Sequence, residues 1–97
     1  MKLDLNFPDF PKDLFKLGKK ELYSLIKTLR TPSMIDFNQI RQSSGLNLER
    51  IKTMRTRKEN TIYSIRITRS FRAILTIEGN YLRFIALHPD HDSAYKK

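Results

Sequence analysis

The clearest pattern in the chain is an alternation of apolar and polar residues between positions 61 and 87. Successive side chains of a strand point to opposite faces, so this alternation predicts strands that each bury one face. We predict three strands, over Ile62–Thr68, Phe71–Ile77 and Tyr81–Leu87. A tight turn at Arg69-Ser70 joins the first two, and Gly79-Asn80 is a typical two-residue hairpin turn before the third.

The same alternation predicts which residues share a face of the sheet. The apolar face would carry Tyr63, Ile65, Ile67, Phe71, Ala73, Leu75, Ile77, Leu82, Phe84 and Ala86. The opposite face would carry Arg66 and Arg72 from the first two strands, with Arg83 beside them from the third. An open sheet face with three arginines is therefore the central prediction.

The residues before these strands have helical spacing. Lys2–Asn6 alternates and predicts a short edge strand, which prolines then interrupt. Apolar spacing predicts one helix from about Pro11 to Arg30, interrupted near Gly18, with Pro32 marking its end. We expect this helix to lie across the apolar face of the sheet.

A second, shorter helix is predicted between positions 33 and 43. Ser33 or Asp36 can cap its beginning, and the helix would run to about Ser43. Gly45 is suited to a left-handed residue just after its end. The fold class that follows is α+β, with N-terminal helices packed on a small antiparallel sheet.

The length of the chain indicates the number of domains, and its charge indicates the kind of partner. The 97 residues suffice for one core, so we expect a single domain over residues 1–97. Lys and Arg number 19 and Asp and Glu 10, a formal net charge of +9, and most of the excess lies within Arg41–Arg72. A concentrated basic surface attracts polyanions and gains from counterion release. Nucleic acid is the favoured partner; a solvated basic face or an acidic protein partner is the alternative.

Three of these bases lie close together in a polar stretch, Thr53–Asn60, which we predict to be a loop. They are Arg55, Arg57 and Lys58. Loops held by a rigid sheet often carry function, and this one can reach around a phosphate backbone. A basic connector without function is an equally good interpretation.

Other features limit the environment of the protein. The chain has no cysteine, so neither a disulfide scaffold nor a thiolate zinc site is available. No apolar run approaches the length that spans a bilayer, and the N-terminus does not resemble a secretion signal. We therefore expect a cytoplasmic protein without a membrane partner.

Titratable side chains gather near the end of the chain, at His88, Asp90, His91, Asp92 and Tyr95. His and Asp can bind metal ions, but structural sites usually need four good ligands, so we expect no metal or other cofactor. Acid–base chemistry is a second interpretation, because His titrates near neutrality and a nearby cation can lower the pKa of Tyr. In a third, the histidines cap the last strand and the tyrosine packs on the core.

RNA cleavage is one reaction that these residue types can perform. Attack by a 2′-hydroxyl needs a base, a group that stabilises the crowded phosphate, and an acid for the leaving oxygen. If Tyr95 folds back over the sheet edge, it would meet Arg72 and Arg66. Arginine binds phosphate oxygens with its planar fork, so Arg, His and Tyr can supply all three functions without a metal.

The second half of the chain contains three segments in a characteristic order, Ser44–Ile51, Tyr63–Ile74 and Leu87–Tyr95. Together they resemble the RelE/ParE superfamily of toxin–antitoxin toxins. The resemblance implies a small fold of helices packed on a twisted antiparallel sheet, and an antitoxin that wraps the toxin. RelE-like members cut mRNA in the ribosomal A site, whereas ParE-like members inhibit DNA gyrase and cleave nothing.

The resemblance also implies roles for individual residues. Arg72 matches the sheet arginine that contacts the scissile phosphate, and Arg66 matches a strand lysine or arginine. Tyr95 matches a C-terminal tyrosine, and His91 a C-terminal basic residue or histidine. Ser64 departs from the pattern, because well-known RelE-type enzymes have a lysine there that helps with proton removal. The identity of the base is therefore open.

These observations lead to one functional hypothesis with two alternatives. The hypothesis is a RelE-like endoribonuclease that cleaves mRNA on the ribosome, with the catalytic residues Arg66, Arg72, His91 and Tyr95. Its RNA-binding residues would be Arg55, Arg57, Lys58, Arg69 and Arg83. The alternatives are a ParE-like gyrase inhibitor without catalysis, and an inactive relative that binds only nucleic acid or its antitoxin.

Overall fold

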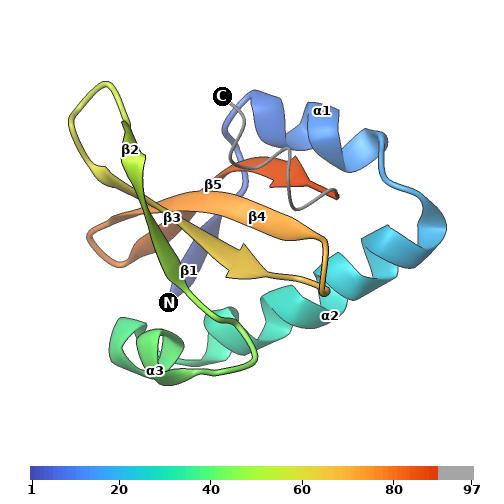
Figure 1. Ribbon diagram of the computed structural model, residues 1–97, viewed down its shortest axis with the longest axis horizontal. Coiled ribbons are helices and arrows are strands. Elements are labelled where there is room, and N and C mark those ends of the chain that lie inside the picture. Colours follow the sequence, from blue (N-terminus) through green and yellow to red (C-terminus); the bar gives the residue numbers. More distant parts are fainter. Residues whose placement is uncertain (90–97) are drawn as a thin grey trace.

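A five-stranded sheet with helices packed against it makes up residues 1–89, the part of the chain that the computed structural model describes (Figure 1). Its elements in chain order are β1 (Lys2–Asp4), α1 (Asp9–Phe15), α2 (Lys19–Met34), α3 (Phe37–Gln42), β2 (Glu49–Arg55), β3 (Thr61–Arg66), β4 (Arg72–Glu78) and β5 (Tyr81–His88). The strand order is β1-β5-β4-β3-β2. The predicted α+β class is confirmed, although β1 pairs parallel to β5 and makes the sheet mixed.

The main core lies between the three helices and one face of the sheet. Each helix contributes a buried side chain, Phe10 from α1, Leu25 from α2 and Ile40 from α3. The strands contribute buried residues at the alternate positions Ile65, Ala73, Leu75, Leu82, Phe84 and Leu87. The ring of Phe10 meets that of Phe84 edge to face, with centroids 5.9 Å apart. The predicted packing of the first helical region on the apolar face is therefore confirmed.

A bulge in β5 corrects one predicted core residue. Ile74 of β4 faces Ala86, but the next residue, Leu75, faces Phe84, so Ile85 is an extra residue in β5. An extra residue reverses the alternation beyond it. Leu87 therefore enters the main core, and Ala86, predicted for the core, lies on the opposite face with Ile74.

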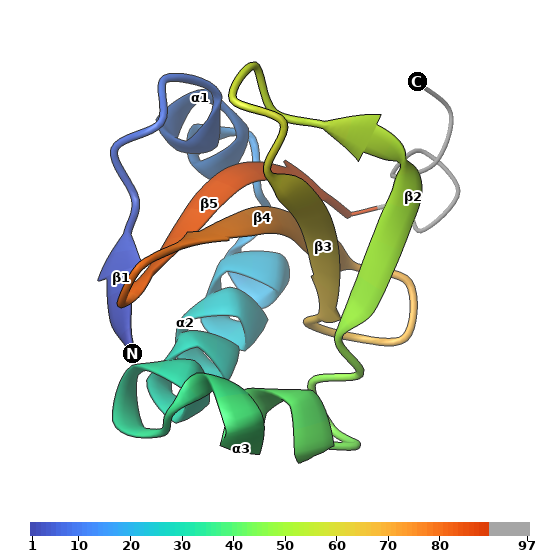
Figure 2. The same ribbon diagram turned by 90° about the vertical axis from the view of Figure 1, so that its left-hand side faces the viewer.

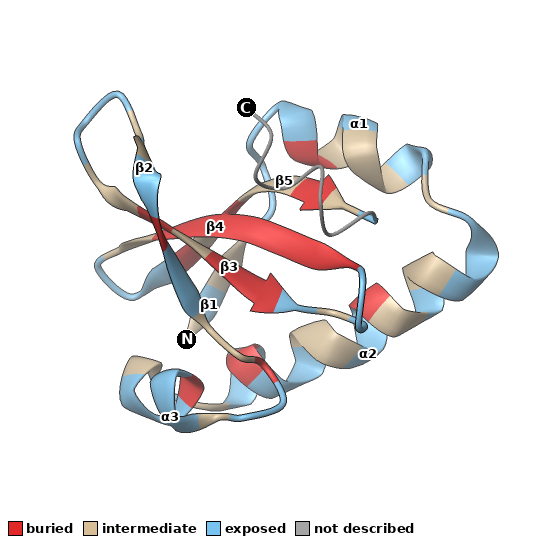
Figure 3. Ribbon diagram, viewed as in Figure 1, coloured by how far each residue is buried: buried red, intermediate tan, exposed pale blue. Residues whose placement is uncertain are grey.

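The opposite face, which we call the outer face, is also partly apolar. It carries Ser64, Arg66, Arg72, Ile74, Thr76 and Arg83, which the strand register places on the same side of the sheet. Ile51, Ile62 and Ile74 form a second buried cluster there. As a result, β4 is buried on both faces over most of its length (Figure 3).

The strand β2 was not predicted, because its residues were assigned in part to a loop. It pairs antiparallel with β3, and only the five residues 56–60 connect the two strands. β2 lies at the edge of the sheet and has one fully buried residue, Ile51. A strand with a single buried position shows no clear alternation, which is why the sequence pattern did not reveal it.

The helices differ from prediction at their ends. The interruption near Gly18 is confirmed, since α1 and α2 are separate helices. The end at Pro32 is wrong: Pro32 lies buried inside α2, and the amine of Met1 donates to the carbonyls of Pro32 and Ile35. These bonds satisfy carbonyl groups that the end of a helix leaves without partners.

No helix within residues 1–89 has the length and apolar character needed to cross a bilayer.

The connection from α3 to β2 confirms one predicted cap and corrects another. Asp36 caps α3, where its carboxylate accepts from the Gln39 backbone at 2.9 Å and the Gln39 side chain accepts in return at 3.0 Å. Gly45 does not adopt a left-handed conformation; Asn47 does, with φ of 45°. Asparagine tolerates this region better than most residues.

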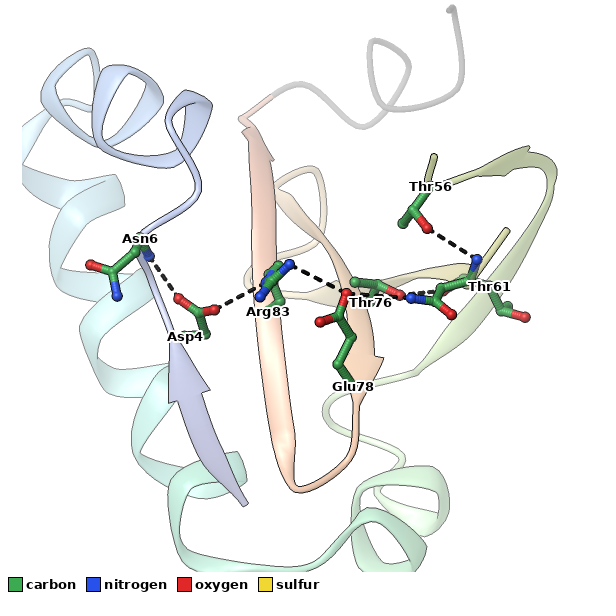
Figure 4. Close-up of polar contacts among 8 residues, drawn as sticks. Asp4, Asn6, Thr56, Thr61, Thr76, Glu78 and Arg83 are labelled. Carbon is green, nitrogen blue, oxygen red and sulfur yellow. Dashed lines mark hydrogen bonds and ion pairs between the residues drawn. The ribbon is translucent and has the colours of Figure 1, made fainter. Parts of the chain in front are cut away.

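A chain of polar contacts crosses the outer face from β1 to the β2–β3 hairpin (Figure 4). Arg83 donates to Asp4 at 3.0 Å on one side and to Glu78 at 3.3 Å on the other. Asn60 of the hairpin also donates to Glu78, at 3.3 Å. These contacts join the short edge strand β1 and the hairpin to the middle of the sheet.

We predict that Asp4 makes the stability of the fold depend on pH. The backbone N–H of Asn6 and the guanidinium of Arg83 lower the pKa of Asp4 below its ordinary value of 3.8. The pKa of Asp4 is lower in the folded than in the unfolded protein, so the ionised carboxylate stabilises the fold fully above the unfolded pKa. This contribution is lost as the pH falls through the folded pKa. Asp4→Asn should cost about 1 kcal/mol or less at pH 7, since the pair is partly exposed.

Thermal melting of both proteins between pH 7 and pH 2 measures this effect. The two curves should converge at low pH, and Glu59→Gln, which changes an exposed acid in the hairpin, should follow the wild type throughout. A difference between Asp4→Asn and wild type that stays constant at every pH would contradict the prediction.

Candidate functional site on the outer face

A row of three basic side chains crosses the outer face at one end of the sheet. In the strand register Arg66 of β3 faces Arg72 of β4, and Arg72 faces His88 of β5. Directly opposed residues of antiparallel strands point to the same face and lie close together. The predicted pairing of Arg66 and Arg72 on one face is thus present, and His88 extends the row.

The prediction that Arg72 lies on an open face of the sheet is wrong, because only 1% of the residue is exposed. Its Nε donates to the hydroxyl of Ser64 at 3.0 Å, and its Nη2 donates to the backbone oxygen of Asn47 at 2.9 Å. The carboxylate of Glu49 lies 3.5 Å from the same Nη2. Three neighbouring groups therefore fix the position and orientation of the guanidinium.

The local sequence explains how Arg72 is held. Ser64 is fully buried on β3 and places a small hydrogen-bond acceptor beside the guanidinium. The left-handed conformation of Asn47 belongs to the loop that brings the second acceptor, its backbone oxygen, to Arg72. Ser64, which sits where the resemblance expects a lysine, thus supports Arg72 rather than adding a charge.

The row keeps the capacity to bind an anion. Among residues 1–89, the Nη1 nitrogen of Arg72 has no hydrogen-bond partner, and the exposed Arg66 has no ion-pair partner. Among the carboxylates of residues 1–89, that of Glu49 alone forms an ion pair with Arg72. Buried donors are normally satisfied, and a guanidinium forms its strongest bonds with phosphate or carboxylate oxygens. The arrangement therefore suits a phosphate group.

Arg83 does not join this row, which corrects the predicted cluster of three arginines. It faces Thr76 of β4, four residues beyond Arg72, a separation of about 14 Å at about 3.4 Å per residue. Asp4 and Glu78 occupy two of its nitrogens. The register therefore places Arg83 at the other end of the outer face, and the two carboxylates hold its side chain there.

The three loop bases lie at that second end. Arg55, Arg57 and Lys58 are exposed in the β2–β3 hairpin and line a groove of about 580 Å³ together with Arg83. The opposite wall of the groove is the connection from β1 to α1, which includes Phe7. The hairpin and α1 both rise beyond the sheet on this side (Figure 2).

The remaining predicted residues divide into two groups. Arg69 is exposed in the turn between β3 and β4, near the Arg66 end of the row. His91 and Tyr95 lie outside the described residues, so their predicted roles stay predictions. Within residues 1–89 no three His, Asp or Glu side chains are placed to hold a metal ion, and the acids at 90 and 92 lie outside that range.

The sequence reasoning missed His88 and Glu49 as members of the site. Unbroken alternation in β5 places residue 88 on the core face with residues 84 and 86, and the bulge at Ile85 moves it to the outer face beside Arg72. Glu49 belongs to β2, the edge strand with a weak pattern, and its contact with Arg72 joins residues 23 positions apart. Neither position carries a signal that is local in the sequence.

Neither a family model nor a curated protein matches the sequence. Among solved structures, the fold matches a chain of the crystal structure of the archaeal RelE–RelB complex from Pyrococcus horikoshii OT3. The match has a TM-score of 0.62 and covers 91% of this chain and 92% of the other, at 11% sequence identity. At that identity the likeness concerns the fold alone. The protein therefore has a RelE-like fold.

Proposed function

We propose that the protein is the toxin of a toxin–antitoxin system and acts as an endoribonuclease that cleaves mRNA on the ribosome. The observation that carries the proposal is the row of Arg66, Arg72 and His88 on the outer face of a RelE-like fold. The net charge of +9 supports a nucleic-acid substrate. The partner in this proposal is an antitoxin, as RelB is the partner of RelE in the matched complex.

In the proposed reaction, Arg72 binds the scissile phosphate. Its Nε and Nη2 are already held by Ser64 and Asn47, so the orientation of the guanidinium is fixed, and its Nη1 would donate to a phosphate oxygen. Arg66 adds a second positive charge next to it. Charge on the phosphate oxygens rises as the 2′-oxygen attacks, and fixed donors stabilise that charge.

Proton transfer completes the proposed mechanism. The 2′-oxygen loses a proton and bonds to phosphorus, and the bond to the 5′-oxygen breaks as that oxygen gains a proton, which gives a 2′,3′-cyclic phosphate and a 5′-hydroxyl. His88 stands in the row beside Arg72 and is the proposed base. His91 and Tyr95, from the resemblance, are the proposed groups for the second transfer. The exposed bases of the hairpin and Arg69 would hold the rest of the RNA.

We predict that the two arginines are needed for cleavage. Arg66→Ala should lower mRNA cleavage at least tenfold, and Arg72→Lys about a hundredfold, because lysine cannot reproduce the fixed fork. Primer extension of mRNA ends after induction in cells measures both. Arg30→Ala, which removes an exposed arginine of α2, should cleave like the wild type.

The outcome also separates the alternatives. Because Arg72 is buried, thermal melting must show that Arg72→Lys is folded, whereas Arg66 is exposed and its loss should not affect folding. Intact mRNA with an early stop of DNA synthesis would favour gyrase as the target and contradict the nuclease. Normal growth on expression without an antitoxin would favour an inactive relative.

We further predict a direct role for His88 in proton transfer. His88→Gln should reduce cleavage and remove the limb of the pH–rate profile that the imidazole supplies, since glutamine does not titrate. His91→Gln, measured in parallel, tests the histidine that the resemblance favours. If His88→Gln keeps the wild-type profile while His91→Gln loses it, the base is in the tail and the assignment to His88 is wrong.

A further inference from the structure

The groove at the hairpin end of the outer face has walls of opposite character. Arg55, Arg57 and Lys58 line the hairpin side, and Asp9 lies on the opposite side. Its interior is largely apolar, with Phe7, Pro8, Ile62 and Ile85, and also includes Thr76, Glu78 and Arg83. We call this the hairpin groove. Its volume of about 580 Å³ falls in the range of small-molecule sites.

A charged pair in the hairpin groove has unused hydrogen-bonding atoms. Arg83 uses Nε for Asp4 and Nη1 for Glu78, and no partner of its Nη2 is found in the described chain. The Oε1 atom of Glu78 accepts from Arg83 and Asn60, while its Oε2 has no hydrogen-bond donor within residues 1–89. The contacts to Asp4 and Asn60 hold both groups in place (Figure 4). The groove thus presents one fixed donor and one fixed acceptor next to an apolar surface.

We propose that the hairpin groove binds one unpaired guanine base of the RNA substrate. The base would stack on Phe7 and the isoleucines, as bases of single strands stack on aromatic side chains. Its N1–H and N2–H would both donate to Oε2 of Glu78, and its O6 would accept from Nη2 of Arg83, since arginine is the usual partner of guanine. The neighbouring phosphates would lie on the hairpin bases.

The distribution of charge favours a nucleotide over an acidic peptide. A nucleotide carries its negative charge at the phosphate and hydrogen-bond donors on its base, which matches cations on one wall and a carboxylate inside. An acidic peptide segment would meet Asp9 and Glu78 with like charge. The groove also lies on the same sheet face as Arg72, about 14 Å along β4 at about 3.4 Å per residue, so a short stretch of extended RNA can reach both. The inference rests on the proposed function and adds a base preference to it.

Binding of RNA that cannot be cleaved tests the proposal. Fluorescence anisotropy would compare the 2′-O-methyl hexamers UUGUUU, UUAUUU and UUUUUU, which lack the attacking hydroxyl. We expect the hexamer with guanine to bind about tenfold more tightly than the other two, as one specific base contact supplies. Glu78→Ala should remove this preference, and Phe7→Ala should weaken binding of UUGUUU several-fold.

Phe15→Ala is the matched control, because Phe15 is an exposed phenylalanine of α1 outside the groove, and it should bind like the wild type. Equal affinity for the three hexamers, or equal behaviour of Phe7→Ala and Phe15→Ala, would overturn the proposal. So would a Phe7→Ala variant that binds RNA normally but loses an antitoxin, because the groove would then be a protein-binding site.

Failure of the groove can be told from failure of the proposed function. The hexamers report binding alone, so a preference for guanine that depends on Glu78 supports the groove even if no mRNA is cut in cells. Conversely, Arg72→Lys should lower cleavage about a hundredfold and keep the preference, because Arg72 lies at the other end of the outer face.

Discussion

Burial of β4 on both faces is the constraint from which the rest of the site follows. All five residues from Arg72 to Thr76 are buried, although the residues at the two ends, Arg72 and Thr76, are polar. Buried polar groups must find partners, since each unsatisfied one costs about 1–3 kcal/mol. Thr76 donates to the carbonyl of Thr61, and Arg72 uses Ser64 and Asn47. The hydrogen bonds that satisfy Arg72 also fix its guanidinium in one orientation, as its proposed role in phosphate binding requires.

A single inserted residue then determines which side chains surround that guanidinium. The bulge at Ile85 sends Leu87 to the core and His88 to the outer face. Without it, residue 88 would point toward the helices and Arg72 would face no imidazole. Bulges are often found beside active sites because they redirect side chains without breaking the sheet. The bulge therefore serves packing and the proposed chemistry together.

The outer face has two polar ends separated by the isoleucine cluster. One end holds the row of Arg66, Arg72 and His88, and the other holds Arg83 with its two carboxylates. Ile74, between them, is buried with Ile51 and Ile62, so an apolar part of the sheet separates the two charged ends. In the proposed function, the reaction takes place at the end that holds Arg72, and base recognition takes place at the end that holds Arg83.

The sequence by itself determined the elements whose signals are local. Alternation predicted β3, β4 and β5 with the common face of Arg66 and Arg72, and turn and cap residues predicted the Gly79-Asn80 hairpin and the Asp36 cap. Only the tertiary structure decided the edge strand β2, the bulge in β5, the burial of Arg72 and the capture of Arg83 by Asp4. Period and turn chemistry are set by neighbouring residues in the chain. Register, burial and ion pairing depend on atoms that come close only after strands far apart in the sequence have paired, so no local pattern contains them.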